Sequence, residues 1–219
     1  MPTRQNFDND LEELKSNIFN LGKMVKQRIC LATESLVNQD LELAETIVMR
    51  DLVVNDLQAS IEKKCILLLA TQQPFAYDLR KVVAGFKISI FLERMGDLSV
   101  DLAKLTIRIG QEKLNDPLVD ILSMSALVQE MVTLALKAYI QEDSKAAVEM
   151  AQMDHKLDKL YSLYYGGLSV LMHEDPTKVP QANYLLFACR FLERMGDYCT
   201  NIAEEIVYLS SGNRVDLNT

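Results

Sequence analysis

Acidic side chains at helical spacing are the residues of this sequence best suited to chemistry. Glu93, Asp97 and Asp101 follow one another at intervals of four, so in a helix they stack along one face. We expect that face to be exposed, opposite an apolar seam. Like charges at this spacing destabilise a helix by about a few tenths of a kcal/mol. A ladder of carboxylates is therefore expected to bind a cation or to tolerate a small loss of stability.

The same ladder occurs a second time. The block Phe-Leu-Glu-Arg-Met-Gly-Asp spans residues 91–97 and returns unchanged at 191–197, an offset of 100. Upstream positions repeat at an offset of 103, as Asp51 does with Asp154. Self-similarity of this kind indicates an internal duplication. The difference between the two offsets predicts that a loop is three residues shorter in the second half.

Further oxygen donors lie one helix upstream of each ladder. If that helix packs beside the ladder helix, five donors converge in each half. The first cluster is Asp51, Asn55, Glu93, Asp97 and Asp101, and the second cluster is Asp154, Asp158, Glu193, Asp197 and Asn201. Each cluster combines four carboxylates with one amide, although the amide has moved from the upstream helix to the ladder helix. The repetition favours a function for these acids over a merely solvated helix face.

Oxygen donors of this type suit Mg²⁺, Mn²⁺, Ca²⁺ or iron better than zinc, although carboxylates also hold zinc. The four Cys form no C-x-x-C pair, and two His cannot complete zinc-finger spacing. We therefore expect divalent or ferric ions, meaning Mg, Mn, Fe or Zn. The simpler alternative is that Arg94 and Arg194 form ion pairs with the acids of the ladders and offset their repulsion. Gly96 and Gly196, each within a predicted helix, indicate close helix approach or room for a ligand.

The elements that must position these side chains are all helical. Apolar periodicity and breaker residues predict helices over about 7–37, 41–73, 78–109, 117–140, 143–172 and 180–211. Asp40 and Asp78 are expected to cap the second and third of them. A turn at 115–117 divides the chain into domains 1–113 and 114–219. The predicted fold is all-α, with two tandem, pseudo-symmetric three-helix bundles.

Composition excludes several classes of function. The formal net charge is −8, and no basic stripe is present that would neutralise a nucleic-acid backbone. We find no Gly-rich phosphate loop, nucleophile elbow or Ser/His/Asp set, so we expect no enzyme. The charged N-terminus lacks an apolar signal region, and no run of 18 apolar residues occurs. These features favour a cytoplasmic protein with no nucleic-acid partner.

Together, several motifs give the chain a family resemblance over nearly its whole length. They are the two repeated blocks with Asp101 and Asn201 downstream, QQPFAYDLR before the first block, HEDPTKVP before the second, and the ending IAEEIVYLSSG. On these motifs the chain resembles the PhoU family of phosphate-transport accessory and regulatory proteins.

The resemblance implies two tandem three-helix bundles whose repeated acidic motifs bind metal ions or clusters. The motifs fall on Glu93, Asp97 and Asp101, and on Glu193, Asp197 and Asn201, where Asn replaces an acid. It also implies negative control of the phosphate ABC transporter, through its ATPase subunit, and of the phosphate sensor histidine kinase. We further expect a homodimer that reaches the membrane only through partners. A carboxylate-bridged metalloenzyme and a metal-free helical adaptor remain the alternatives.

Overall fold

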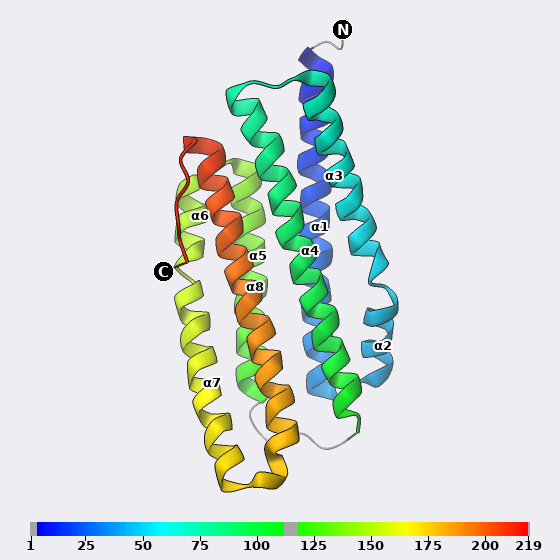
Figure 1. Cartoon of the computed structure of the whole chain (residues 1–219), viewed down its shortest axis with the longest axis vertical. Coiled ribbons are helices and arrows are strands. Elements are labelled where there is room, and N and C mark those ends of the chain that lie inside the picture. Colours follow the sequence, from blue (N-terminus) through cyan, green and yellow to red (C-terminus); the bar gives the residue numbers. More distant parts are fainter. Residues whose placement is uncertain (1–3, 112–117, 219) are drawn as a thin grey trace.

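The computed structural model describes residues 4–111 and 118–218, and every regular element in them is helical. Figure 1 shows long helices running along a common axis. In chain order they are α1 (Arg4–Asn38), α2 (Leu41–Met49), α3 (Leu52–Gln72), α4 (Ala76–Ile109), α5 (Leu118–Gln141), α6 (Ser144–Ala151), α7 (Asp154–Glu174), the 3-10 turn η1 (Pro176–Lys178) and α8 (Val179–Ser211). The all-α prediction is confirmed. The boundary predicted between residues 113 and 114 and the turn at 115–117 lie outside the described residues.

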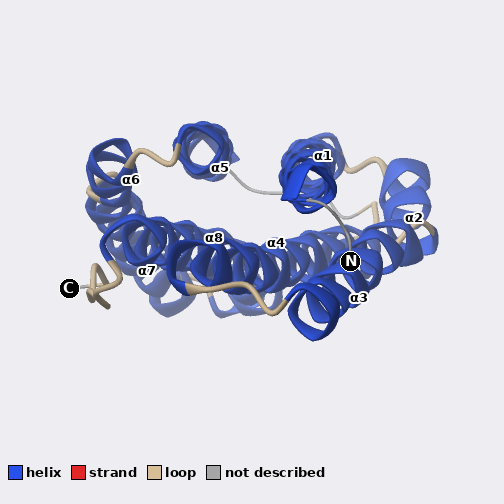
Figure 2. Cartoon of the chain, turned by 90° about the horizontal axis from the view of Figure 1, so that it is seen from above, coloured by secondary structure: helices blue, strands red, loops and turns tan. Residues whose placement is uncertain are grey.

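The helices form two similar halves. In the first half α1 packs against α3 and α4, and in the second α5 packs against α7 and α8. Contacts between α4 and α8 and between α1 and α5 join the halves. Viewed along the helices, α3, α4, α8 and α7 form one layer, and α2, α1, α5 and α6 form the other (Figure 2). One continuous apolar core fills the space between the layers.

Two of the predicted helices are each broken in the structure. The helix expected over 41–73 is interrupted at Arg50–Asp51, and the helix expected over 143–172 is interrupted at Gln152–Met153. At both places the backbone forms hydrogen bonds between residues three apart, such as Met153 N to Met150 O at 2.9 Å. These replace bonds between residues four apart that would continue an α-helix. Neither break contains Gly or Pro, so the sequence offered no breaker signal. The breaks place Asp51 and Asp154 at the start of α3 and α7.

The helix caps agree in part with the prediction. The side chain of Asp40 accepts a hydrogen bond from Leu43 N at 2.9 Å and caps α2. The prediction that Asp78 is a cap is wrong. Phe75 occupies the N-cap position of α4, and Asp78 instead pairs with Arg4 at 2.7 Å. This ion pair ties the beginning of α1 to the beginning of α4.

The apolar seam expected on α4 forms the centre of the molecule. Its members Met95, Leu98, Leu102, Leu105 and Ile109 are buried. Phe91 is half-buried and stacks on Tyr198 of α8, with ring centroids 6.1 Å apart. The two copies of the repeated helix therefore pack against each other, and the duplication builds a shared core.

One helix of the described residues is long and apolar enough to cross a membrane, over Asp120–Gln141 in α5. Half of this window is buried inside the protein, where α5 packs against α1 and α8. A core helix has this composition for packing reasons alone.

Candidate functional site

The first cluster lies where the start of α3 meets α4. Asn55 Nδ2 approaches Asp51 Oδ2 at 3.5 Å along α3. On α4, burial and then the charge of Asp97 raise the pKa of Glu93, and the charge of Asp51 adds to this effect. The pKa of Asp97 is raised by burial and then by Asp51. The structure therefore brings the acids of the two helices together, half-buried between the helices and not on an exposed face as predicted.

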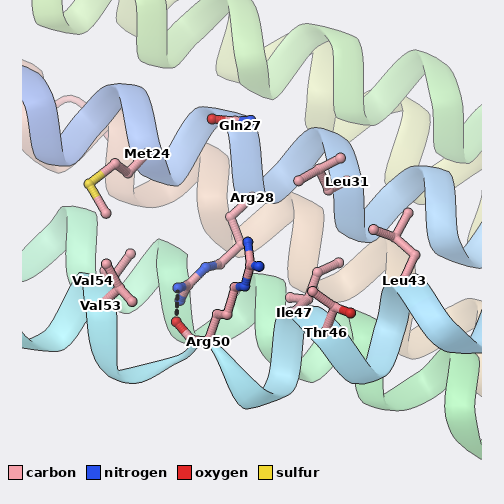
Figure 3. Close-up of a pocket in the computed structure, with 10 residues that line it drawn as sticks. All are labelled: Met24, Gln27, Arg28, Leu31, Leu43, Thr46, Ile47, Arg50, Val53 and Val54. Carbon is pink, nitrogen blue, oxygen red and sulfur yellow. Dashed lines mark hydrogen bonds between the residues drawn. The ribbon is translucent and has the colours of Figure 1, made fainter.

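Basic side chains surround the first cluster. Arg28 of α1 is buried and donates from Nη1 to Asp51 Oδ1 at 3.1 Å and from Nη2 to the carbonyl oxygen of Arg50 at 2.8 Å. The second of these bonds is drawn in Figure 3. Arg94 lies 3.6 Å from Glu93, which confirms the expected ion pair, and Lys104 pairs with Asp101 at 2.9 Å. Sequence analysis missed Arg28, because it belongs to a different helix and no periodic pattern links it to the acids.

The second cluster centres on Asp154. This residue begins α7 and is only 7% exposed. Burial raises the pKa of Asp154 to about 7, and the charges of Asp158, Asp197 and Glu193 act in the same direction. The cause is the cost of placing a charge in a poorly solvated site next to like charges. The carboxylates of Asp158, Asp197 and Glu193 therefore lie near enough for their charges to act on Asp154.

Two oxygen atoms of the second cluster have no partner. Asp154 Oδ1 and Glu193 Oε2 are buried without a hydrogen bond, whereas the other carboxylate oxygen of Glu193 accepts from Arg190. Gly196 makes room for this arrangement, because a Cβ atom there would lie 2.5 Å from Asp154 Oδ1. A buried, unpaired carboxylate oxygen is costly unless it is protonated or binds a cation. The chemistry of these oxygen donors therefore suits a cation.

The amide positions differ between the clusters. Asn55 Oδ1 is a further buried oxygen without a partner in the first cluster. Asn201, at the far end of the second ladder, accepts a hydrogen bond from Asn218 Nδ2 at 3.1 Å. The C-terminal segment therefore folds back over this end of the second cluster.

In the part of the chain that the structure describes, no group of three or more His, Cys, Asp or Glu side chains is arranged to hold a metal ion. In each cluster the acids are close enough for their charges to affect one another's pKa. Their oxygens are not arranged around a common metal position. Metal binding therefore stays a prediction, supported by the donor chemistry and by the unpaired oxygens.

The repeat shows how the two halves differ in compensating charge. At the offset of 103, Arg28 corresponds to Met131, so the second cluster has no basic residue from α5 at that place. At the offset of 100, Arg190 corresponds to Ile90, and in the first half Arg94 pairs with Glu93 from another position of the ladder helix. Within the described residues, the first half has basic partners for its upstream acid Asp51 and for its ladder acid Glu93, whereas the second half has one for Glu193 and none for Asp154.

Comparisons with known proteins agree with the duplicated architecture. The family model described as the PhoU domain matches residues 18–106 and again residues 121–206. The chain is 41% identical over 217 residues to the phosphate-specific transport system accessory protein PhoU homolog of Clostridium acetobutylicum, covering 99% of both chains. It is 37% identical to the homolog of Aquifex aeolicus, covering 94% of this chain and 93% of that one.

Solved structures show the same fold. The crystal structure of PhoU from Pseudomonas aeruginosa matches with a TM-score of 0.90 at 32% identity, covering 94% of this chain and 100% of that one. The crystal structure of the phosphate transport system regulatory protein PhoU from Streptococcus pneumoniae also matches with a TM-score of 0.90 at 32% identity, covering 96% and 99%.

Proposed function

Because the chain belongs to the PhoU family, we propose that it is a non-enzymatic, metal-binding regulator of phosphate transport. In this proposal it restrains the phosphate ABC transporter and its sensor kinase when phosphate is plentiful. The named relatives are accessory proteins of the phosphate-specific transport system, which supports a regulatory role. The single observation that supports metal binding is the pair of buried, unpaired oxygens on Asp154 and Glu193.

The second cluster is the stronger candidate for an ion. Asp154, Asp158, Glu193 and Asp197 supply its carboxylates, and the described structure gives Asp154 no basic partner. In the first cluster, Arg28 already neutralises part of the charge on Asp51. A bound Mg, Mn, Fe or Zn ion would supply positive charge that bridges carboxylates of neighbouring helices. We therefore expect ions at both clusters, with tighter binding at the second.

The proposed partners follow from charge and from the family. The chain carries a net charge of −8, and its sequence has no anion-binding loop, so phosphate status would reach it through bound cations or through a partner. Charge on docking surfaces governs the rate of encounter and the register of a complex. We propose that the ATPase subunit of the transporter and the sensor histidine kinase are those partners. The protein would be cytoplasmic, homodimeric, and held at the membrane only by these contacts.

A deletion strain with a reporter for phosphate-uptake genes tests this function. We expect deletion to switch the reporter on in phosphate-rich medium, and the wild-type gene to switch it off again. Asp154→Ala with Glu193→Ala should restore control only in part while the protein remains folded. Glu149→Gln, on the exposed face of α6, is the matched control and should restore it fully. A reporter that stays silent in the deletion strain would refute the regulatory role.

A further inference from the structure

A pocket opens on the first half where α1 faces the break between α2 and α3. Its volume is about 420 Å³. Apolar side chains from all three helices form most of its wall, including Met24, Leu31, Leu43 and Val53. Arg28 and Arg50 line the same pocket (Figure 3). The pocket therefore combines an apolar floor with two guanidinium groups.

The two arginines differ in their hydrogen-bond and ion-pair partners. Arg28 is held by Asp51 and by the carbonyl oxygen of Arg50. The Arg50 side chain extends from the break toward α1 and lies beside Arg28 (Figure 3). Its guanidinium has no ion pair within residues 4–111 and 118–218. In a chain with a net charge of −8, this is a local site of positive charge that is open to an acidic group.

Large apolar side chains are exposed on the connection between α2 and α3, beside the pocket that Val53 helps to line. Met49 is 74% exposed, Leu52 is 68% exposed and Val53 is 52% exposed. They flank Arg50 on the connection between α2 and α3. An exposed apolar group of this kind beside a pocket is typical of a protein interaction site. A small ligand inside the pocket would leave this rim uncovered, so the rim favours a macromolecular occupant.

The internal repeat provides a comparison within the same chain. At the offset of 103 the second half replaces the apolar rim residues with polar or basic ones, Met49 by Gln152, Leu52 by His155 and Val53 by Lys156. It also replaces Thr46 by Glu149 and Arg50 by Met153. The neighbouring hollow there is lined by the apolar Leu127, Leu160 and Leu163 together with Glu130, Lys156 and Lys159, and no arginine takes part. Both halves keep the same fold, so the fold does not require the residues of the first half. The combination of apolar rim and arginines is specific to the first half.

We propose that this pocket and its rim form a docking site for a partner protein, which inserts a large apolar side chain next to a Glu or Asp. The apolar side chain fills the pocket against Met24 and Leu43, and the carboxylate pairs with Arg50. Charge complementarity and the difference between the two halves of the repeat support this proposal. It goes beyond the proposed function, because it requires neither a bound metal nor a component of phosphate transport.

Selection of displayed random peptides of twelve residues on the untagged, full-length protein tests the proposal. We expect enriched peptides to share an acidic residue close to a large apolar one. Their affinity should fall by about tenfold or more in Arg50→Met, since the partner's carboxylate loses its ion pair. The triple variant Thr46→Glu, Arg50→Met, Val53→Lys carries the residues of the second half and should abolish binding. Glu149→Gln should leave binding unchanged.

Methyl resonances of methionine locate the bound peptide. Met24 and Met49 should shift on titration, while Met150 and Met153 in the second half should not. Enriched peptides without an acidic residue, equal binding to Arg50→Met, or no enrichment at all would each overturn the proposal. Shifts of Met24 and Met49 caused equally by inorganic phosphate or by anionic phospholipid vesicles would also overturn it, in favour of a free anion or a membrane surface.

Discussion

The guanidinium of Arg28 on α1 donates a hydrogen bond of 3.1 Å to the carboxylate of Asp51 at the start of α3. The repeat of this pair in the second half is Met131 and Asp154, and Asp154 Oδ1 has no partner. The equivalent acids of the two halves, Asp51 and Asp154, therefore have different surroundings. The first half supplies a positive side chain, and the second leaves a buried carboxylate oxygen for an ion or a proton.

The first prediction concerns Arg28→Met, which places in the first half the residue type found at the equivalent position of the second half, Met131. Because the competing positive charge is removed, Mn²⁺ should bind the first cluster at least about tenfold more tightly. Calorimetric titration in an Asp154→Ala, Asp158→Ala background isolates that cluster. Lys63→Met, at an exposed position of α3 with no ion pair to the cluster in the described structure, is the control for general loss of charge. An unchanged Mn²⁺ affinity in Arg28→Met would show that Arg28 does not compete with the ion.

The second prediction concerns stability in the absence of metal. The folded-state pKa of Asp154 is raised by burial and neighbouring acids from 3.8 to about 7. The unfolded chain therefore releases this proton at lower pH than the folded protein does, and the free energy of unfolding falls as the pH rises from about 4 to about 7. Asp154→Asn should remove this loss and raise stability at pH 8 by roughly 1 to 3 kcal/mol.

Urea unfolding in EDTA, repeated from pH 4 to pH 8, measures this effect. The gain should shrink toward zero at pH 4, where Asp154 is protonated in the folded protein. Asp51→Asn is the matched change in the first half and should have the opposite sign at pH 8, because buried Arg28 loses its partner. Equal effects of the two substitutions would contradict the asymmetry between the clusters.

Much of this architecture could be predicted from the sequence, because it depends on local patterns. The apolar seam of Met95, Leu98 and Leu102 predicted which face of α4 is buried, and the repeated block revealed the duplication. The gathering of acids on two neighbouring helices also followed from spacing. The helix breaks were not predicted, because the chain at Arg50 and Met153 carries no breaker residue and tertiary packing overrides helix propensity there.

The charge compensation could not be predicted for a related reason. Arg28 lies 23 residues before Asp51, on another helix, and its contact depends on how α1 packs against α3. The unpaired oxygen on Asp154 likewise depends on close packing at Gly196, which no helical pattern specifies. Sequence periodicity identifies the face of a helix, whereas ion pairs across helices depend on the packed structure.

The third prediction compares the two glycines of the repeated block. At Gly196 an added Cβ would lie 2.4 Å from Leu157 Cδ2 and 2.5 Å from Asp154 Oδ1, whereas at Gly96 the nearest atom would be Val54 Cγ1 at 3.0 Å. Gly196→Ala should therefore displace both Leu157 and Asp154, lower stability by roughly 1 to 3 kcal/mol and weaken ion binding at the second cluster. Gly96→Ala should be near neutral, because a better helix propensity of about 1 kcal/mol offsets a small displacement. Thermal unfolding of both variants measures the difference, and a larger loss in Gly96→Ala would contradict it.

The fourth prediction concerns Glu142 in the turn between α5 and α6. Burial opposes its charge, but hydrogen bonds from Lys15, Tyr77 and Lys81 lower its pKa from 4.5 to about 2. These contacts stabilise the folded protein above pH 4.5, and the contribution is lost as the pH falls from 4.5 toward 2. Glu142→Gln should therefore lower the free energy of unfolding at pH 7 by roughly 1 to 3 kcal/mol.

Denaturant unfolding of Glu142→Gln at pH 7 and at pH 3 measures this dependence. The deficit should be smaller at pH 3, where the wild type has also lost part of the interaction. Glu149→Gln controls for the loss of one surface charge and should show little change at either pH. A deficit that does not depend on pH would assign the role of Glu142 to packing alone.

Elemental analysis of untagged protein, as purified and after incubation with Mn²⁺, Fe²⁺ or Mg²⁺, tests metal binding most directly. We expect bound metal in the wild type, loss of the first-half ion alone in Glu93→Ala with Asp97→Ala, and loss of the second-half ion alone in Asp154→Ala with Glu193→Ala. Bound metal should also raise the melting temperature of the wild type. A folded wild-type protein with no bound metal under any of these conditions would contradict the account.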